Sequence, residues 1–135
     1  MALDPKSLRY ATTHEWVQLE NGSEGQKIVT VGLSDFAIKA LTDLVHIELP
    51  QTGRKVVAGS ALGEVESVKA VSDIYSPVDG EIIQVNHALA DRLETLDQDP
   101  FGEGWLVKIR VSDDGGLARL LDYTAYQKQC EQEAS

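Results

Sequence analysis

The sequence predicts a mainly β protein, a sandwich of two antiparallel sheets with a short internal helix and a C-terminal helix. Short runs of alternating apolar and polar residues recur along most of the chain, and tight-turn residues separate them. Helical spacing of apolar residues occurs only around residues 33–42 and after residue 116. A chain of 135 residues, 42% of them hydrophobic, is long enough to bury one core without disulfides. We therefore expect a single domain over residues 1–135.

The first half of the chain begins with a predicted hairpin. Residues 15–20 and 26–31 alternate as strands do, and Asn21-Gly22 between them is a strong turn signal. The period then changes over residues 33–42, where Ser34 is placed to cap a short helix and Asp35 favours its N-terminal dipole.

The second half predicts further short strands, followed by a helix. The expected strands are residues 43–49, 55–57, 61–67, 71–76, 81–86 and 104–111. Residues 88–100 are polar and predict an irregular surface loop. A C-terminal helix is expected over about 116–131, where leucines form an apolar stripe and Thr124 with Gln127 fits a capping box.

Charge and composition limit the classes of function. The chain carries 12 Lys and Arg against 22 Asp and Glu, a net charge of −10, which argues against nucleic-acid and anionic-membrane partners. The single cysteine excludes an internal disulfide and a cysteine-based zinc cluster. The histidines lack metal-ligand spacing, and no nucleophile motif or phosphate loop is present, so we expect neither a metal site nor an enzyme.

One segment, residues 63–80, does carry a chemical signal. Two strand-like runs flank the sequence Ser-Val-Lys-Ala at 67–70, which puts Lys69 at the exposed tip of a hairpin. It is the only lysine or arginine between Lys55 and Arg92. Its acidic neighbours are Glu64, Glu66 and Asp73. A lysine in a turn is usually only solvated, but a single amine on a rigid hairpin is also what a modifying ligase can address.

Motifs along nearly the whole chain resemble the H proteins of the glycine cleavage system, a family of lipoyl carriers. The matching stretches are YATTHEWV at 10–17, VGLSDFA at 31–37, LVHIELP at 44–50, ESVKA at 66–70, SPVDGE at 76–81 and DPFGEGW at 99–105. Each stretch alone is a weak signal, whereas the set is highly specific.

The resemblance implies a lipoyl/biotinyl barrel-sandwich fold, with lipoate joined to Lys69 by an amide. It implies a carrier that shuttles the aminomethyl group of glycine among three enzymes. These are glycine decarboxylase (P protein), aminomethyltransferase (T protein) and dihydrolipoamide dehydrogenase (L protein). A lipoate ligase or transferase would modify Lys69 after recognising the hairpin residues Glu66, Ser67, Val68 and Ala70. The chemistry then belongs to the cofactor and to those enzymes.

The resemblance also implies a cleft on the carrier in which the loaded arm rests. The position-matched residues are Thr13, Glu15 and Asp73. Because the carried group ends in an amine, a carboxylate with a hydroxyl beside it can hydrogen-bond that amine and slow its loss to water. We therefore expect Glu15 and Asp73 to hold the amine.

The chain departs from the family pattern at Thr42, Leu93 and Asp97, where glycine, proline and asparagine are usual; we expect all three to lie away from the hairpin. Other readings are a biotinyl carrier, a lipoyl domain of another complex, an unmodified β domain and a lipoate-relay protein. Biotinyl carriers favour methionine beside the lysine, whereas Val68 and Ala70 stand there in this chain. The expected compartment is the cytoplasm for a bacterial protein, or the mitochondrial matrix for a processed eukaryotic form.

Overall fold

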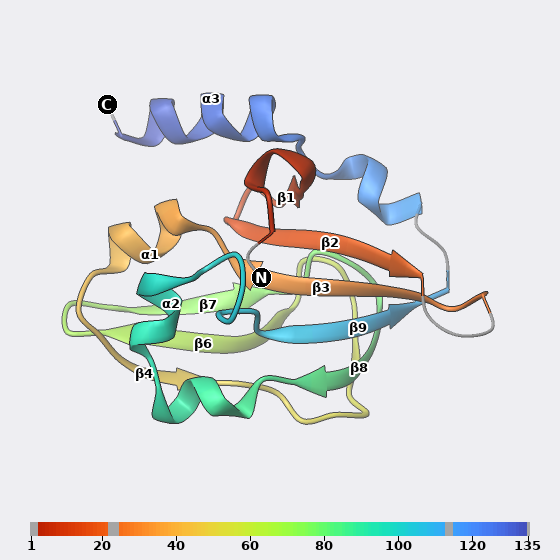
Figure 1. The fold of residues 1–135 in the computed structure, drawn as a ribbon, viewed down its shortest axis with the longest axis horizontal. Coiled ribbons are helices and arrows are strands. Elements are labelled where there is room, and N and C mark those ends of the chain that lie inside the picture. Colours follow the sequence, from red (N-terminus) through yellow and green to blue (C-terminus); the bar gives the residue numbers. More distant parts are fainter. Residues whose placement is uncertain (1–2, 22–24, 113–114, 135) are drawn as a thin grey trace.

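The computed structural model describes residues 3–21, 25–112 and 115–134, and it shows the predicted pair of antiparallel sheets (Figure 1). The larger, six-stranded sheet has the order β1-β2-β3-β9-β8-β5, and the three-stranded sheet has the order β4-β6-β7. The larger sheet is made of β1 (Arg9–Tyr10), β2 (Glu15–Asn21), β3 (Lys27–Leu33), β5 (Lys55–Val56), β8 (Gly80–Val85) and β9 (Val107–Val111). The smaller sheet is made of β4 (Leu44–Glu48), β6 (Ala61–Ser67) and β7 (Val71–Tyr75).

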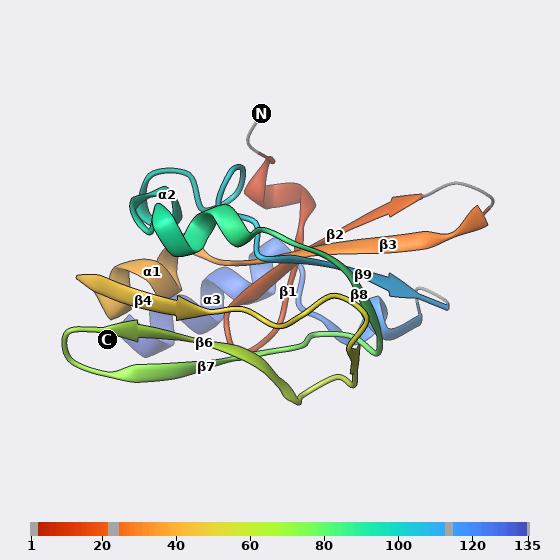
Figure 2. The same ribbon diagram turned by 90° about the horizontal axis from the view of Figure 1, so that it is seen from below.

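The core lies between the two sheets, because alternate residues of each strand point inward. Val29, Val31 and Ile109 of the larger sheet pack in one apolar cluster with Val65 and Ile74 of the smaller sheet. The helices cover the margins and are short (Figures 1 and 2). In the described part of the chain, none of them is long and apolar enough to cross a membrane.

The predicted hairpin of β2 and β3 is confirmed, with Glu15 opposite Leu33. Its expected turn at Asn21-Gly22 runs into residues 22–24, outside the described residues. In the same ladder Trp16 is fully buried and lies opposite Gly32. A Cβ atom at Gly32 would stand 2.4 Å from the indole ring, so only glycine lets this ring lie across the strand.

Helix α1 (Asp35–Leu41) follows β3 as predicted. The Ser34 hydroxyl caps it by accepting a hydrogen bond from the Ala37 amide at 3.2 Å. The helix ends at Thr42, whose φ of 51° and ψ of 155° fall in a region that favours glycine, and Asp43 follows at a φ of 43°. A β-branched residue in this conformation stores backbone strain next to the helix end.

Replacing Thr42 with glycine is therefore expected to stabilise the protein by about 1 kcal/mol, because relief of the strain outweighs the greater entropy of an unfolded glycine. Thr42→Ala keeps the Cβ atom and should gain less than the glycine variant. Urea unfolding of the three proteins measures the difference. A Thr42→Gly variant less stable than the parent would show that Thr42 is not strained.

The prediction of an irregular loop at residues 88–100 is wrong. This segment holds the 3₁₀ helix η3 (His87–Asp91) and α2 (Glu94–Gln98). Leu89 and Leu96 are buried in the core, and partly buried Leu93 packs against it. Neither helix has a side-chain cap, so the start signals that mark helices in a sequence are missing here.

The predicted C-terminal helix over 116–131 is divided in two. A 3₁₀ helix, η4 (Gly115–Arg119), comes first, and α3 (Tyr123–Ala134) begins after a break. The break exists because Leu121 pairs with Tyr10 through two backbone hydrogen bonds of 2.8 Å, which a continuous helix could not make. Asp122, not the predicted Thr124, caps α3, and its carboxylate accepts the Ala125 amide at 2.9 Å.

Candidate functional site

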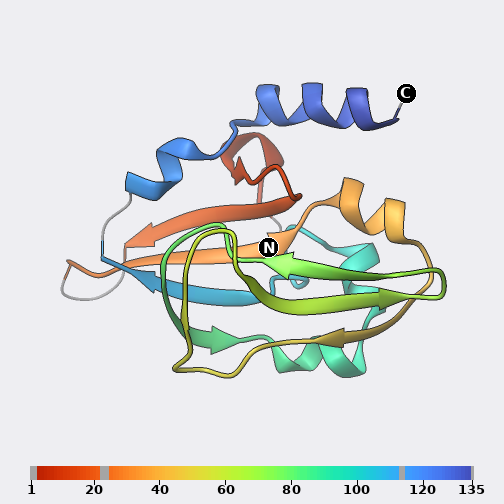
Figure 3. The ribbon, with the colours of Figure 1, turned by 180° about the vertical axis from the view of Figure 1, so that it is seen from behind.

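The hairpin of β6 and β7 places Lys69 at its tip, as predicted, at one end of the molecule (Figures 2 and 3). The turn is closed by Ser67, whose amide donates to the Ala70 carbonyl at 2.8 Å. The buried Ser67 hydroxyl also accepts the Ala70 amide at 3.2 Å. Two-residue hairpin turns usually need residues of positive φ, and neither Val68 nor Lys69 has one. The Ser67 side chain therefore adds a second hydrogen bond across the turn to the one that the backbone makes.

The tip is also fastened to the body of the protein. The Val68 amide donates to the Asp43 carbonyl at 3.1 Å, and Leu44 pairs with Ser67 at the start of β4. The expectation that Thr42 lies away from the hairpin is consequently wrong, because its neighbour Asp43 holds the tip. Lys69 itself is exposed, and no residue that the structure describes forms an ion pair with its ammonium group.

Two exposed valines flank the hairpin tip at Lys69, and a row of acidic side chains lies further along the hairpin. Val68 and Val71 are 71% and 58% exposed, which is unusual for valine. On the outer face of the smaller sheet, Glu48, Glu64 and Asp73 lie directly opposite one another on three adjacent strands. Desolvation and the neighbouring carboxylates, Glu48 first, raise the pKa of Glu64. We call these three carboxylates the acidic row.

The predicted cleft residues Thr13 and Glu15 are in contact. Glu15 is 1% exposed, and one carboxylate oxygen accepts a short hydrogen bond from the Thr13 hydroxyl. The other oxygen accepts the Tyr75 amide at 3.2 Å, which joins the carboxylate to β7. Burial raises the pKa of Glu15 from 4.5 to about 7, although these hydrogen bonds favour its charged form.

Asp73 is on the same strand as Tyr75 but is not a partner of the Glu15 carboxylate. It is exposed and belongs to the acidic row, two residues closer to Lys69 than Tyr75 is. One strand residue spans about 3.3 Å, so Asp73 lies roughly 7 Å along β7 from the Tyr75 amide that Glu15 accepts. Exposed Thr13 and buried Glu15 thus form a polar site that opens at the surface, and Asp73 lies between that site and the hairpin tip.

Of two surface cavities, one reaches Thr13 and the other lies beside Thr42 and Asp43. A groove of about 680 Å³ reaches Thr13 from the Tyr75 end of β7, the end remote from Lys69. A second cavity, of about 700 Å³, lies between α1 and the segment 90–97. Its lining includes Thr42, Leu93 and Asp97, the three positions where the resemblance leads us to expect other residues at or near them. The departures therefore cluster in space although they are far apart in the sequence.

Sequence reasoning missed the backbone groups that build the site. The Tyr75 amide and the Asp43 carbonyl carry no residue-type signal, so no pattern of side chains could have pointed to them. It also missed His14, whose ring bonds to Tyr126 on α3. Among the residues that the structure describes, no cluster of three His, Cys, Asp or Glu side chains could hold a metal ion.

The arrangement offers two chemical capacities. An exposed primary amine on a rigid turn can form an amide and swing an attached chain through solvent. Burial brings the pKa of the Glu15 carboxyl to about 7, so this group can change its charge state near neutral pH. A cationic amine entering beside it would draw it fully into the charged form.

Comparison with known proteins shows which family the chain and its fold resemble. A sequence profile described as Glycine cleavage H-protein matches residues 8–133. The glycine cleavage system H protein of Rhodopirellula baltica is 49% identical over 132 residues, which cover 98% of each chain. That of Thermotoga maritima is 44% identical, over 95% of this chain and 99% of its own. The crystal structure of a glycine cleavage system H protein from Mycobacterium marinum superposes with a TM-score of 0.81 at 36% identity, covering 93% of this chain and 98% of that one.

Proposed function

The chain belongs to the glycine cleavage H-protein family and is a lipoyl carrier of glycine cleavage, and we propose that Lys69 is the residue that bears its lipoyl group. The observation that carries this proposal is the exposure of Lys69 on a hairpin tip fixed by Ser67 and by the Asp43 carbonyl. A fixed Cα atom with a free four-carbon side chain suits both modification by an enzyme and delivery of the attached arm. We propose that residues 1–135 form one lipoyl-carrier domain.

We further propose that the carrier serves three enzymes in turn. A lipoyl group held by Lys69 would supply a disulfide able to take up the aminomethyl group at glycine decarboxylase and present it to aminomethyltransferase, and the dithiol left afterwards would be the substrate of dihydrolipoamide dehydrogenase. The chain itself supplies the attachment point and a resting place for the arm. We do not assign it a catalytic residue, and its cellular site would be the cytoplasm for a bacterial protein or the mitochondrial matrix for a processed eukaryotic one.

The resting place proposed for the carried amine is the site of Thr13 and Glu15. The Glu15 carboxylate is buried and accepts hydrogen bonds from the Thr13 hydroxyl and the Tyr75 backbone amide. Its pKa is raised to about 7. An ammonium group gains a charge-assisted hydrogen bond there and is kept from water. Asp73, which lies between this site and the tip, would guide the amine at the rim and not hold it.

The hairpin surface is proposed as the part that the lipoate ligase or transferase and the partner enzymes recognise. Exposed Val68 offers an apolar contact beside Lys69, while Glu66, Ser67 and Ala70 shape the turn. The acidic row adds a negative face next to the tip. Like charges directly opposite one another in a sheet repel each other. Basic residues at the rim of a partner's binding site would reduce this repulsion when the partner docks.

Glycine–bicarbonate exchange tests this function directly. The purified decarboxylase should exchange labelled bicarbonate into glycine only when the lipoylated chain is added. The apparent KM for the carrier should rise by about threefold or more between about 0.02 M and 0.3 M salt, because screening weakens the pairing of the acidic row.

Two results would redirect the interpretation. If the lipoylated chain supports no exchange, the shuttle role fails, and the chain would instead be a relay that passes lipoate to other proteins. A KM that does not change with salt would leave the carrier role intact but would assign the acidity to solubility alone.

A further inference from the structure

The loop that joins β1 to β2 carries the cleft residues and has an unusual conformation. The Ala11 amide donates to the Glu15 carbonyl at 2.9 Å, and the His14 amide donates to the Ala11 carbonyl at 2.9 Å. Thr12, Thr13 and His14 thus form a short hairpin loop whose last residue, His14, has a φ of 83°. Such loops normally end on glycine or asparagine, because other side chains are unfavourable in the left-handed region.

The His14 ring is held by contacts that can offset this backbone cost. Its Nδ1 atom lies 2.7 Å from the Tyr126 hydroxyl, and its Nε2 atom lies 3.0 Å from a Glu133 carboxylate oxygen. The ring also stacks on Phe36 of α1, with 5.1 Å between the ring centroids. Two of these three partners, Tyr126 and Glu133, belong to α3, more than one hundred residues away in the chain.

A second contact from α3 reaches the start of the loop. The Gln129 side-chain amide donates to the Thr12 carbonyl at 2.7 Å and to the Glu133 carboxylate at 2.7 Å. Residues on both sides of Thr13 are therefore fixed by the same helix, while the Thr13 hydroxyl points to Glu15.

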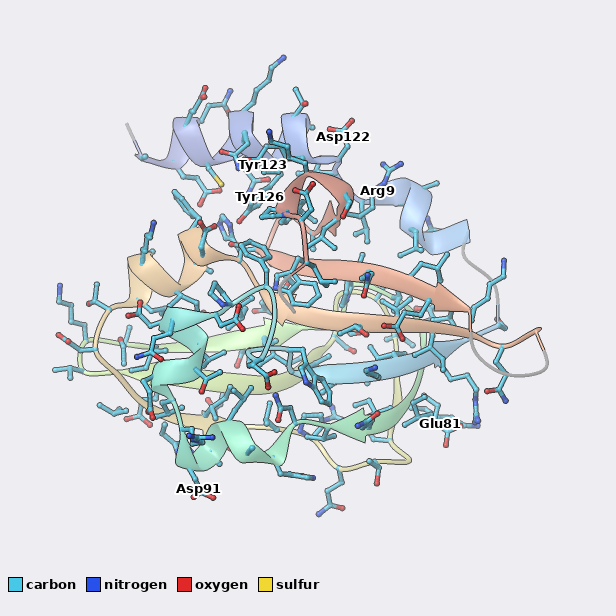
Figure 4. All side chains as sticks on the ribbon, in the orientation of Figure 1. Arg9, Glu81, Asp91, Asp122, Tyr123 and Tyr126 are labelled. Carbon is cyan, nitrogen blue, oxygen red and sulfur yellow. The ribbon has the colours of Figure 1, made fainter. Side chains whose placement is uncertain are left out.

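Tyr126 is itself buried and held by several contacts, so it can anchor this arrangement. It is 1% exposed, and its ring stacks on Tyr10 with 4.2 Å between centroids and 3° between planes. Its hydroxyl also lies 2.5 Å from the hydroxyl of Ser34, the capping residue of α1. Figure 4 shows Tyr126 and Tyr123 on the side of α3 that faces β1.

We propose that the C-terminal helix positions the arm cleft. Tyr126 acts through His14, and Gln129 acts through Thr12, to fix the loop that aims the Thr13 hydroxyl and the Glu15 carboxylate at β7. These are positioning residues, since each acts through a contact with the loop and not through Thr13 or Glu15 directly. What the cleft holds rests on the proposed function, whereas the positioning itself is a property of the chain without lipoate.

The Tyr75 amide reports on this positioning in the unmodified protein, because its N–H donates to the Glu15 carboxylate. Its proton chemical shift should follow the ionisation of Glu15, with a midpoint of about 7 in the parent protein. In Tyr126→Phe, which keeps the ring stack and loses only the hydroxyl, the pH-dependent shift change should fall by about half or more. His14→Gly, which keeps the turn, should behave in the same way.

Glu131→Gln is the matched control, since Glu131 is an exposed carboxylate on α3 that is not among the partners of the loop. It should leave the Tyr75 titration unchanged. Thermal melts of all the proteins verify that the variants are folded. If Tyr126→Phe and His14→Gly both keep the parent amplitude and midpoint at Tyr75, the helix does not position the cleft.

A second measurement separates this inference from the function on which it draws. In the lipoylated carrier loaded with the aminomethyl group, Tyr126→Phe should release ammonia about three to ten times faster than the parent. If the Tyr75 signal changes but the release rate does not, positioning is supported, and it is the role of Glu15 in holding the amine that fails.

Discussion

Replacing Lys69 with arginine is expected to remove both the lipoyl modification and all activity in glycine–bicarbonate exchange. Arginine keeps the positive charge and the long side chain, but its guanidinium group does not form the amide that a lysine amine forms. The folded state should be unaffected, since Lys69 is exposed, and the free energy of unfolding should change by less than about 0.5 kcal/mol. Intact mass of the protein co-expressed with an active ligase measures the modification.

Lys55→Arg is the matched control for this experiment. Lys55 is an exposed lysine at the start of β5, in the larger sheet, and it does not lie at the tip of a hairpin. That variant should carry the lipoyl increment and support exchange as the parent does. A lipoyl mass increment that persists in Lys69→Arg, traced by peptide mapping to another lysine, would overturn the assignment of the attachment site.

The fold and the hairpin could be predicted because their signals are local. Strand alternation and turn residues gave the two sheets, and the flanking strands alone put Lys69 at a tip. The helices near residues 88–98 have no such start signals, since their only support is the burial of Leu89 and Leu96 in the core. The same holds for the break before α3, which depends on the pairing of Leu121 with a strand far away in sequence.

The cleft could be predicted only in part. The family resemblance pointed to Thr13 and Glu15, but the burial of Glu15 and its bond to the Tyr75 amide arise from the meeting of β2 with β7. The role of Asp73 toward the amine stays a prediction, and the structure adds that its side chain is exposed in the acidic row. Hydrogen bonds to backbone groups and burial by distant segments do not change the spacing of residue types. The burial and the raised pKa of Glu15 could therefore be found only from the structure.

Glu15→Gln is expected to make the empty carrier more stable, by an amount that depends on pH. The folded protein raises the pKa of this carboxyl from 4.5 to about 7, so the folded state binds more protons than the unfolded state between these values. Stability is therefore lost as the pH rises from about 4.5 to 7, by up to about 3 kcal/mol in total. Glutamine does not titrate, and its amide oxygen can still accept the Tyr75 amide.

The stability gain of Glu15→Gln over the parent should thus be near zero at pH 4 and approach its maximum at pH 8, as measured by urea unfolding at each pH. Glu20→Gln, on the same strand but with a side chain that is 41% exposed, is the control and should show no such trend. A gain for Glu15→Gln that is the same at pH 4 and pH 8 would show that the buried carboxyl is not destabilising at neutral pH.

The same substitution should have the opposite effect on the loaded carrier. Without the carboxylate the carried amine loses a charge-assisted hydrogen bond of about 1.5–3 kcal/mol, so ammonia should be released about ten times faster or more. Release measured in the absence of the transferase gives this rate, and unchanged release would refute a role for Glu15 in retention. A buried carboxylate that destabilises the empty protein and protects the loaded one is the pattern expected of a binding group, because its desolvation is compensated only when the cationic ligand arrives.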